Sequence, residues 1–176
     1  MINLGPACGR MIELLHGVPA EALSRPTPCA EYTVMDLIAH VDQVARGFTA
    51  MAVNQPEQPA GADPGDGLPE RVKALGEAWS DEAAWRGTAV IGGGLELPRE
   101  RWGKIALTEV VVHGWDLAVA TGQPFEPDER TLRDCLAHVA EFVPGAPLPE
   151  LWGPPVAVPA DAPLLDRILG ITGRTP

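Results

Sequence analysis

Three side chains of the types that bind divalent metals stand where helices could bring them together. Glu109 and His113 are four residues apart in the largely apolar segment LTEVVVHGWDLAVATGQ, residues 107–123. On a helix, this spacing places both side chains on one face, one turn apart, so that both can contact one atom. His40 lies at the edge of the apolar stripe of an earlier expected helix and is the natural third ligand. Two imidazoles and one carboxylate with open positions form the ligand set of catalytic zinc and of several iron and nickel sites. We therefore predict a divalent metal site, with zinc as the first expectation and nickel, iron or manganese as alternatives.

Two aspartates could support this site. Asp116 follows Glu109 by seven residues and falls on the same helical stripe, and Asp36 precedes His40 by one turn. Burying an isolated ionised carboxylate among apolar residues costs free energy, and a bound cation would offset that cost. We expect Asp36 or Asp116 to accept a hydrogen bond from a ligand imidazole or to contact a substrate.

Spacing alone leaves other interpretations open. Glu109 and His113 could form an internal ion pair without any metal. A metal could also be a structural staple in a non-catalytic bundle that binds a small ligand or a partner, and such sites close the fourth position with a protein ligand. Cys29 could be a nucleophile or a ligand, but a free cysteine is more often a small buried hydrophobe. His16 and His138 are interpreted as structural, His138 on the exposed side of an amphipathic helix.

Helical periodicity recurs along the chain and predicts the elements that must position these residues. Apolar residues repeat at helical spacing in five long segments and one short one. The second of these has a well-defined start, because Thr33 can cap the first turn while Asp36 reaches back in a capping box. The fourth has clear end signals at Gly122 and Pro124. The expected helices cover residues 4–15, 34–48, 68–85, 98–122, 128–142 and 164–169.

The connections complete the expected architecture. Residues 54–69 are rich in proline, glycine and acidic residues, which predicts a mobile surface loop that could cover the metal site. Residues 144–163 form a proline-rich arm before the short terminal helix. No convincing run of alternating strands is present, so the pattern predicts an all-α bundle in a single domain spanning residues 1–176.

The bulk composition argues against several classes of function. Lys and Arg number 13 against 24 Asp and Glu, a net charge of −11, which disfavours binding to nucleic acid. No uninterrupted apolar run could span a membrane, and the first residues lack the order of a signal peptide, so we expect a cytoplasmic protein without a membrane partner. The three cysteines are odd in number and widely spaced, which predicts free thiols.

Three segments together resemble a known family. They are RPTPCAEYTVMDLIAHV at 25–41, ALTEVVVHGWDLAVATGQP at 106–124 and GPPVAVPADAPLLDRILGITGRTP at 153–176. These segments are similar to those of actinobacterial metal-binding proteins related to the N-terminal domain of mycothiol-dependent maleylpyruvate isomerase, in the DinB-like superfamily. This chain has Tyr32 where the family commonly has tryptophan, and the isomerase itself carries an additional C-terminal domain.

The resemblance implies a fold, a metal and a chemistry. It implies an up-down four-helix bundle in which a divalent ion is held at the positions of His40, Glu109 and His113. Better-characterised relatives use the ion to bind a low-molecular-weight thiol, mycothiol or bacillithiol, which reacts with a small electrophile. A metal-bound thiol ionises near neutral pH and supplies a nucleophile without a protein cysteine. The expected activity is therefore a metal-dependent thiol S-transferase or isomerase, and a homodimer is a further expectation.

Overall fold

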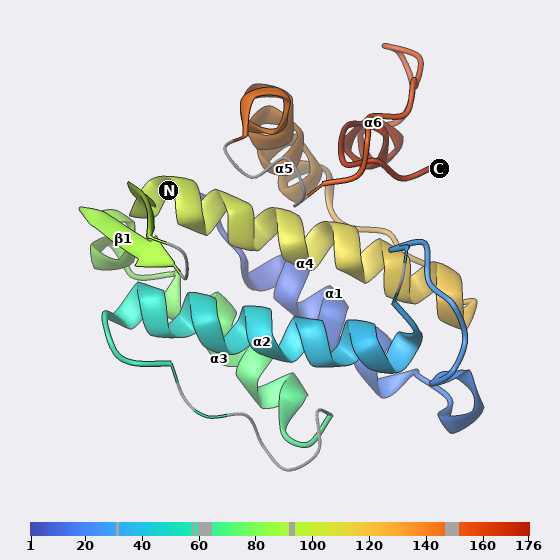
Figure 1. Ribbon diagram of the computed structural model, residues 1–176, viewed down its shortest axis with the longest axis horizontal. Helices are drawn as coiled ribbons and strands as arrows, with labels where there is room; N and C mark the ends of the chain where they lie inside the picture. The colour runs from blue at the N-terminus through green and yellow to red at the C-terminus, as the bar shows by residue number, and fades with distance from the viewer. Residues whose placement is uncertain (31, 58, 60–64, 92–93, 147–151) are drawn as a thin grey trace.

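The computed structural model describes residues 1–30, 32–57, 59, 65–91, 94–146 and 152–176 (Figure 1). Parts of the expected loop at 54–69 and of the proline-rich arm at 144–163 lie outside these residues. The helices are α1 (Gly5–His16), α2 (Val34–Val53), α3 (Leu68–Ala78), α4 (Arg99–Thr121), α5 (Glu129–Phe142) and α6 (Leu164–Ile171). A hairpin of β1 (Thr88–Ile91) and β2 (Leu95–Pro98) precedes α4, and short 3-10 turns lie at Ala20–Ala22, Glu82–Trp85 and Val143–Gly145. The mainly helical fold predicted from the sequence is confirmed.

Helices α1 to α4 form a bundle in which α1 contacts α3 and α4, and α2 contacts the same two helices. Helix α4 runs antiparallel to α2, because His40 meets Glu109 while Phe48, later on α2, meets Trp102, earlier on α4. Helix α3 instead runs parallel to α2, because Arg71 near its start binds Asp42 while Trp79 at its end donates to the Phe48 carbonyl, later on α2. The start of α3 therefore lies at the opposite end of the bundle from the end of α2. The expected alternation of up and down helices therefore holds for α1 with α2 and for α3 with α4, whereas α2 and α3 are joined by a crossover.

Helix α2 begins as its sequence predicts but continues to Val53, beyond the expected end at residue 48. Thr33 Oγ1 accepts a hydrogen bond from the Asp36 amide at 3.3 Å, and the Asp36 carboxylate accepts one from the Thr33 amide at 3.0 Å. This reciprocal pair satisfies two amides that the first helical turn leaves without helical partners. The helix ends at Asn54, whose φ of 54° and ψ of 47° place it in the left-handed conformation common after helix ends.

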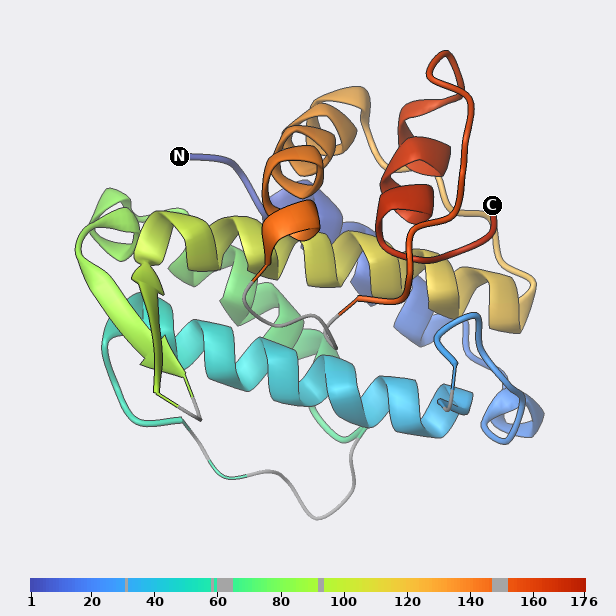
Figure 2. The same cartoon turned by 45° about the horizontal axis from the view of Figure 1, so that its top comes forward.

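Helix α4 is the central element of the molecule. Its interior residues between Trp102 and Ala118 are almost all buried. The bundle covers one side of the helix, and α5 and α6 pack across the other (Figures 1 and 2). This second cover explains why its sequence is apolar on nearly every side. Helix α4 ends at Gly122, whose φ of 72° suits glycine.

Two segments differ from the sequence predictions. The helix expected over 68–85 ends at Ala78 and is followed by the 3-10 turn at Glu82–Trp85. His138 was expected on an exposed face, and this expectation is wrong: the residue is only 2% exposed, and its ring stacks on Phe142. The reason is that α5 packs against both α4 and α6, so that it has little exposed face at this position.

The C-terminal arm folds back onto the terminal helix. The Val156 amide donates a hydrogen bond to the Gly170 carbonyl at 2.8 Å, so the arm runs directly against α6. A side chain at position 170 would come within 2.5 Å of Val158, so only glycine allows this approach. None of the described helices is long and apolar enough to cross a bilayer.

Candidate metal centre

The antiparallel packing of α2 and α4 brings three predicted ligands together in the middle of both helices. Glu109 Oε2 lies 3.2 Å from Nε2 of His40 and 3.2 Å from Nε2 of His113. The two imidazole rings meet edge to face with centroids 4.7 Å apart. The three potential ligand atoms all lie within 4.8 Å of one another. Two nitrogens and one oxygen thus converge on a single point, although 69 residues separate His40 from Glu109.

Burial and hydrogen bonding act in opposite directions on the two α4 residues. Burial alone would raise the pKa of Glu109, but hydrogen bonds from His113 and His40 outweigh it and lower the pKa to about 2. Burial would lower the pKa of His113, but its bonds to Asp116 and Glu109 raise it to about 9. Without a metal, the site therefore holds a carboxylate and an imidazolium. A metal ion would take the place of the imidazolium proton.

Asp116 holds the far side of the His113 ring. Its Oδ2 lies 2.9 Å from His113 Nδ1, and its side chain is completely buried. An Nδ1–H bound to this carboxylate leaves Nε2 as the nitrogen that can bind a metal. Arg174 in turn donates to Asp116 from Nη2 at 2.9 Å and from Nε at 3.3 Å. A buried chain of polar contacts thus links the C-terminal segment to the candidate metal centre.

Sequence reasoning placed Asp116 near the site but missed Arg174. The only available signal for Arg174 was its position in the C-terminal segment that resembles the family, because nothing in its spacing relates it to α4. Arg174 is 8% exposed and also donates to the Thr172 carbonyl at 2.7 Å. Its guanidinium supplies the positive charge that a buried Asp116 requires.

Asp36 does not occupy the role expected for it beside the imidazoles. Its carboxylate accepts hydrogen bonds from the Thr33 amide and, at 2.5 Å, from the Thr33 hydroxyl. These bonds lower the pKa of Asp36, which lies on the exposed first turn of α2. The structure therefore assigns this carboxylate to the helix cap.

Cys29 lies beside the same centre. Its Sγ and ligand atoms of His113 and Asp116 lie within 4.8 Å of one another, so that two possible metal-binding groups share His113. Burial raises the pKa of the half-buried thiol, although the nearby Arg174 charge partly opposes this effect. Because both Asp116 oxygens already bind Arg174, this second group is less available to a metal than the one that contains His40.

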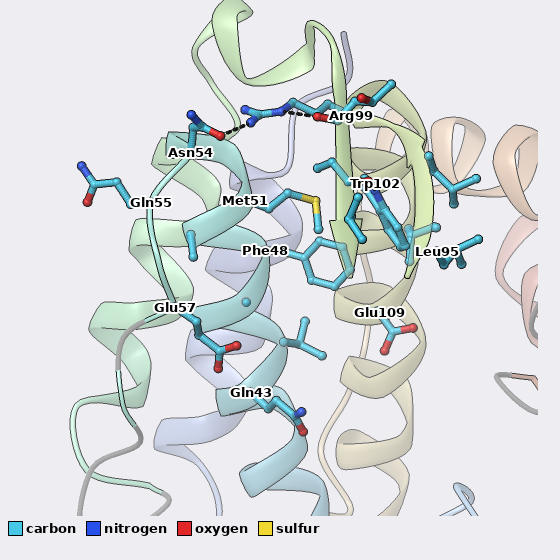
Figure 3. Close-up of a pocket in the computed structure, with 18 of the residues that line it drawn as sticks. Gln43, Phe48, Met51, Asn54, Gln55, Glu57, Leu95, Arg99, Trp102 and Glu109 are labelled. Atoms are coloured by element: carbon cyan, nitrogen blue, oxygen red, sulfur yellow. Dashed lines mark hydrogen bonds between the residues drawn. The ribbon is translucent and has the colours of Figure 1, made fainter. Parts of the chain in front are cut away.

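A cavity of about 740 Å³ opens beside the candidate metal centre (Figure 3). His40 and Glu109 line it, so the three-residue group faces the cavity through these two side chains. The cavity continues between α2, the segment after α2, the hairpin and the start of α4. Its wall is mainly apolar between the polar groups, with Phe48, Met51, Leu95, Trp102 and Ile105 among its residues. A site with open coordination positions could therefore receive a small molecule from this side.

Comparison with known proteins relates the chain to one group. Residues 4–118 match the family described as the mycothiol maleylpyruvate isomerase N-terminal domain. Two uncharacterized proteins of Mycobacterium tuberculosis, from strains CDC 1551 and H37Rv, are each 32% identical, over 92% of this chain and 90% of theirs.

Solved structures share the fold. The mycothiol-dependent maleylpyruvate isomerase matches with a TM-score of 0.51 at 19% identity, and a histidine-to-alanine mutant of it matches with a TM-score of 0.54 at 18% identity. Each match covers 76% of this chain and 65% of the isomerase chain. This chain thus spans 65% of the length of those solved proteins.

Proposed function

This chain belongs to the mycothiol maleylpyruvate isomerase N-terminal domain family, and on that premise we propose that it is a divalent-metal-dependent enzyme. The proposed substrates are a low-molecular-weight thiol of the mycothiol type and a small electrophile, in an S-transfer or isomerisation reaction. The observation that carries the proposal is the convergence of His40, Glu109 and His113 at one end of a cavity.

The chemistry of these residues fits a catalytic metal. Two imidazole nitrogens and a carboxylate oxygen suit zinc, with nickel, iron and manganese as alternatives. His40 has a side-chain exposure of 24%, against 7% for Glu109 and 8% for His113, so the group is closed on the α4 side and accessible beside His40. When bound, such an ion supplies the positive charge that ionises a thiol near neutral pH.

The residues of this chain prepare the site before any ligand enters. Asp116 holds the Nδ1–H of His113 and so directs Nε2 of that ring toward Glu109 and His40. Arg174 holds Asp116 in place from the C-terminal segment. Because these contacts are buried, the ligand nitrogen of His113 needs little rearrangement to bind a cation.

The apolar part of the cavity has a separate role. Phe48 and Trp102 lie edge to face with centroids 6.3 Å apart, and the Trp102 indole donates to the Ala89 carbonyl at 2.9 Å. These contacts fix a wall between α2, α4 and the hairpin. A wall of this kind excludes water from a bound thiol and electrophile, which strengthens electrostatic interactions at the reacting atoms.

Metal analysis of protein purified without chelators tests the proposal directly. We expect about one equivalent of a divalent metal in the wild type and less than roughly a tenth in His40→Ala, Glu109→Gln and His113→Ala. His16→Ala is the matched control, because His16 is exposed at the end of α1 and should leave the metal content unchanged. A metal-free wild type, or undiminished metal in His113→Ala, contradicts the proposal.

Cys29→Ser separates an enzyme from a bundle with a structural metal. If Cys29 closes the coordination, this variant loses the metal and chelation lowers the melting temperature strongly, while an added thiol has no effect. If the fourth coordination position is open, Cys29→Ser keeps the metal. Mycothiol then raises the melting temperature of the zinc-loaded protein and leaves that of the metal-free protein unchanged. We expect the second result, because His40 and Glu109 face the cavity.

A further inference from the structure

Arg99, the first residue of α4, lies at the end of the cavity away from the candidate metal centre (Figure 3). It precedes Glu109 by ten residues on the same helix, which corresponds to about 15 Å along the helix axis. Apolar side chains of Phe48, Met51 and Trp102 lie between these two positions in Figure 3. The cavity therefore has two polar ends joined by an apolar middle.

The Arg99 guanidinium binds only neutral oxygens among the described residues. Nη2 donates to Asn54 Oδ1 at 2.7 Å, Nε to the Thr88 carbonyl at 3.3 Å and Nη1 to the Ala52 carbonyl at 3.5 Å. A guanidinium has five N–H donors, so two remain after these bonds. Arg174, by contrast, binds a carboxylate directly. Within the described part of the chain, the charge of Arg99 has no such partner.

The carboxylates of the cavity are already engaged elsewhere. Glu57 is bound by Arg46, and Glu109 lies between the two imidazoles of the metal centre. Charges about 15 Å apart are largely screened at physiological ionic strength, where the Debye length is about 8 Å. Arg99 is also the only arginine or lysine among the described residues that line the cavity. The far end of the cavity is thus positively charged in a protein whose net charge is −11.

We propose that Arg99 is an anion-binding subsite, and that the cavity takes an elongated ligand with a thiol at the metal centre and a carboxylate at Arg99. The thiol end of this ligand rests on the proposed function, and the carboxylate end rests on Arg99 alone. A planar guanidinium with two unused N–H groups matches a carboxylate. A cavity of about 740 Å³ is also of the size that encloses ligands far larger than a small electrophile.

Paired synthetic thiols test the subsite. One probe is an ω-mercaptoalkanoic acid long enough to reach from the metal to Arg99, and the other is the ω-mercaptoalkanol of the same length, which is neutral. Calorimetric titration of the zinc-loaded wild type at low salt should show the acid binding about tenfold more tightly. Equal affinities for acid and alcohol overturn the proposal without any variant.

Variants at position 99 locate the effect. Arg99→Gln should remove the preference for the acid while leaving the affinity for the alcohol unchanged, and Arg99→Lys should keep part of the preference. The alcohol also reports whether the cavity has kept its shape, because Arg99 joins the hairpin to the end of α2. Arg133→Gln is the matched control, since Arg133 forms an exposed ion pair with Glu129 on α5 and does not line the cavity. Full acid preference in Arg99→Gln overturns the proposal.

A third pair of measurements separates this subsite from the metal chemistry. Metal-free protein is titrated with an alkanoic acid that lacks the thiol and with the corresponding alkanol. In one outcome, the metal-free protein binds the acid more tightly than the alkanol only when Arg99 is present, while zinc and a thiol group do not increase the affinity. This result supports the subsite and contradicts the proposed function. Zinc-dependent thiol binding with no acid preference supports the proposed function and overturns the subsite.

Discussion

Two buried carboxylates on the bundle helices are neutralised in different ways. Asp42 on α2 is 3% exposed and Glu109 on α4 is 5% exposed. Asp42 is bound by two arginines, with Nε of Arg46 at 2.8 Å and Nε of Arg71 on its other oxygen. Glu109 is bound by imidazoles. The first carboxylate joins α2 to α3, and the second joins α2 to α4 beside the cavity.

This difference separates a structural site from one that can do chemistry. An arginine keeps its proton at any physiological pH, so the two partners of Asp42 stay charged and have no lone pair to offer a cation. Hydrogen bonding to Asp42 raises the pKa of Arg46 further. An imidazole can lose its proton and bind a metal with the same nitrogen. The partner of a buried carboxylate therefore indicates its role better than burial does.

The largest predicted effect on folding is at the arginine-bound carboxylate. Asp42→Asn removes the buried carboxylate that Arg46 and Arg71 share, and we expect the free energy of unfolding to fall by about 3 kcal/mol. Urea denaturation measures this loss. The zinc affinity of the folded variant should match the wild type, and a loss of zinc binding would show that the two carboxylates are not independent.

Glu109→Gln should weaken zinc binding more than it lowers stability, which is the opposite of Asp42→Asn. We expect zinc affinity, measured by competition with a chromophoric chelator, to fall at least about 100-fold, because a neutral amide replaces the anionic ligand. With a chelator present, the variant should lose less stability than Asp42→Asn, since residue 109 lines the cavity, where water can reach it, and the His113 imidazole can become neutral. An equal loss of stability in both variants would remove the distinction.

Arg174→Gln tests the contact that supports His113. Removing this guanidinium leaves Asp116 with His113 as its main partner, and we expect zinc affinity to fall about tenfold. Arg133→Gln is a matched control, because Arg133 forms an exposed ion pair with Glu129 on α5. Unchanged zinc affinity in Arg174→Gln would limit the role of Arg174 to folding.

The smallest predicted effect is on the pH dependence of the metal-free protein. The raised pKa of His113 stabilises the fold fully below its ordinary value of 6.5, and this stabilisation is lost as the pH rises through about 9. The lowered pKa of Glu109 stabilises the fold above 4.5, and this stabilisation is lost as the pH falls toward about 2. With a chelator present, the melting temperature of the wild type should exceed that of Glu109→Gln by the largest margin between pH 4.5 and pH 6.5.

Zinc should change this profile in a defined direction. Binding displaces a proton from His113, so the stabilisation by zinc should increase from pH 6 to pH 9, on the order of one proton released per ion. Scanning calorimetry with and without zinc measures the difference. A zinc effect that does not vary with pH would mean that His113 is not a ligand.

Local features of the site could be predicted from the sequence. The Thr33 cap and the Gly122 end signal act within one helical turn, so short motifs predict the start of α2 and the end of α4. The four-residue spacing of Glu109 and His113 is local in the same way. His40 required two further pieces of information, its place at the edge of an apolar stripe and the resemblance to a family.

Long-range features could not be predicted from patterns of this kind. The bond between Arg174 and Asp116 joins residues 58 positions apart, and no periodicity relates them. The parallel course of α2 and α3 depends on how a long connection crosses the bundle, which hydrophobic spacing does not specify. The burial of His138 depends on how α5 packs against α4 and α6, whereas its own helix shows a clear polar side.

The separation of His40 from Glu109 along the chain also has a kinetic consequence. Contacts between distant residues form only after the entropy of closing the intervening loop has been lost, and here that loop contains a crossover. We therefore expect the three ligand atoms to come together late in folding, when α2 and α4 have docked. A metal that binds only this assembled site should leave the folding rate nearly unchanged and act by slowing unfolding.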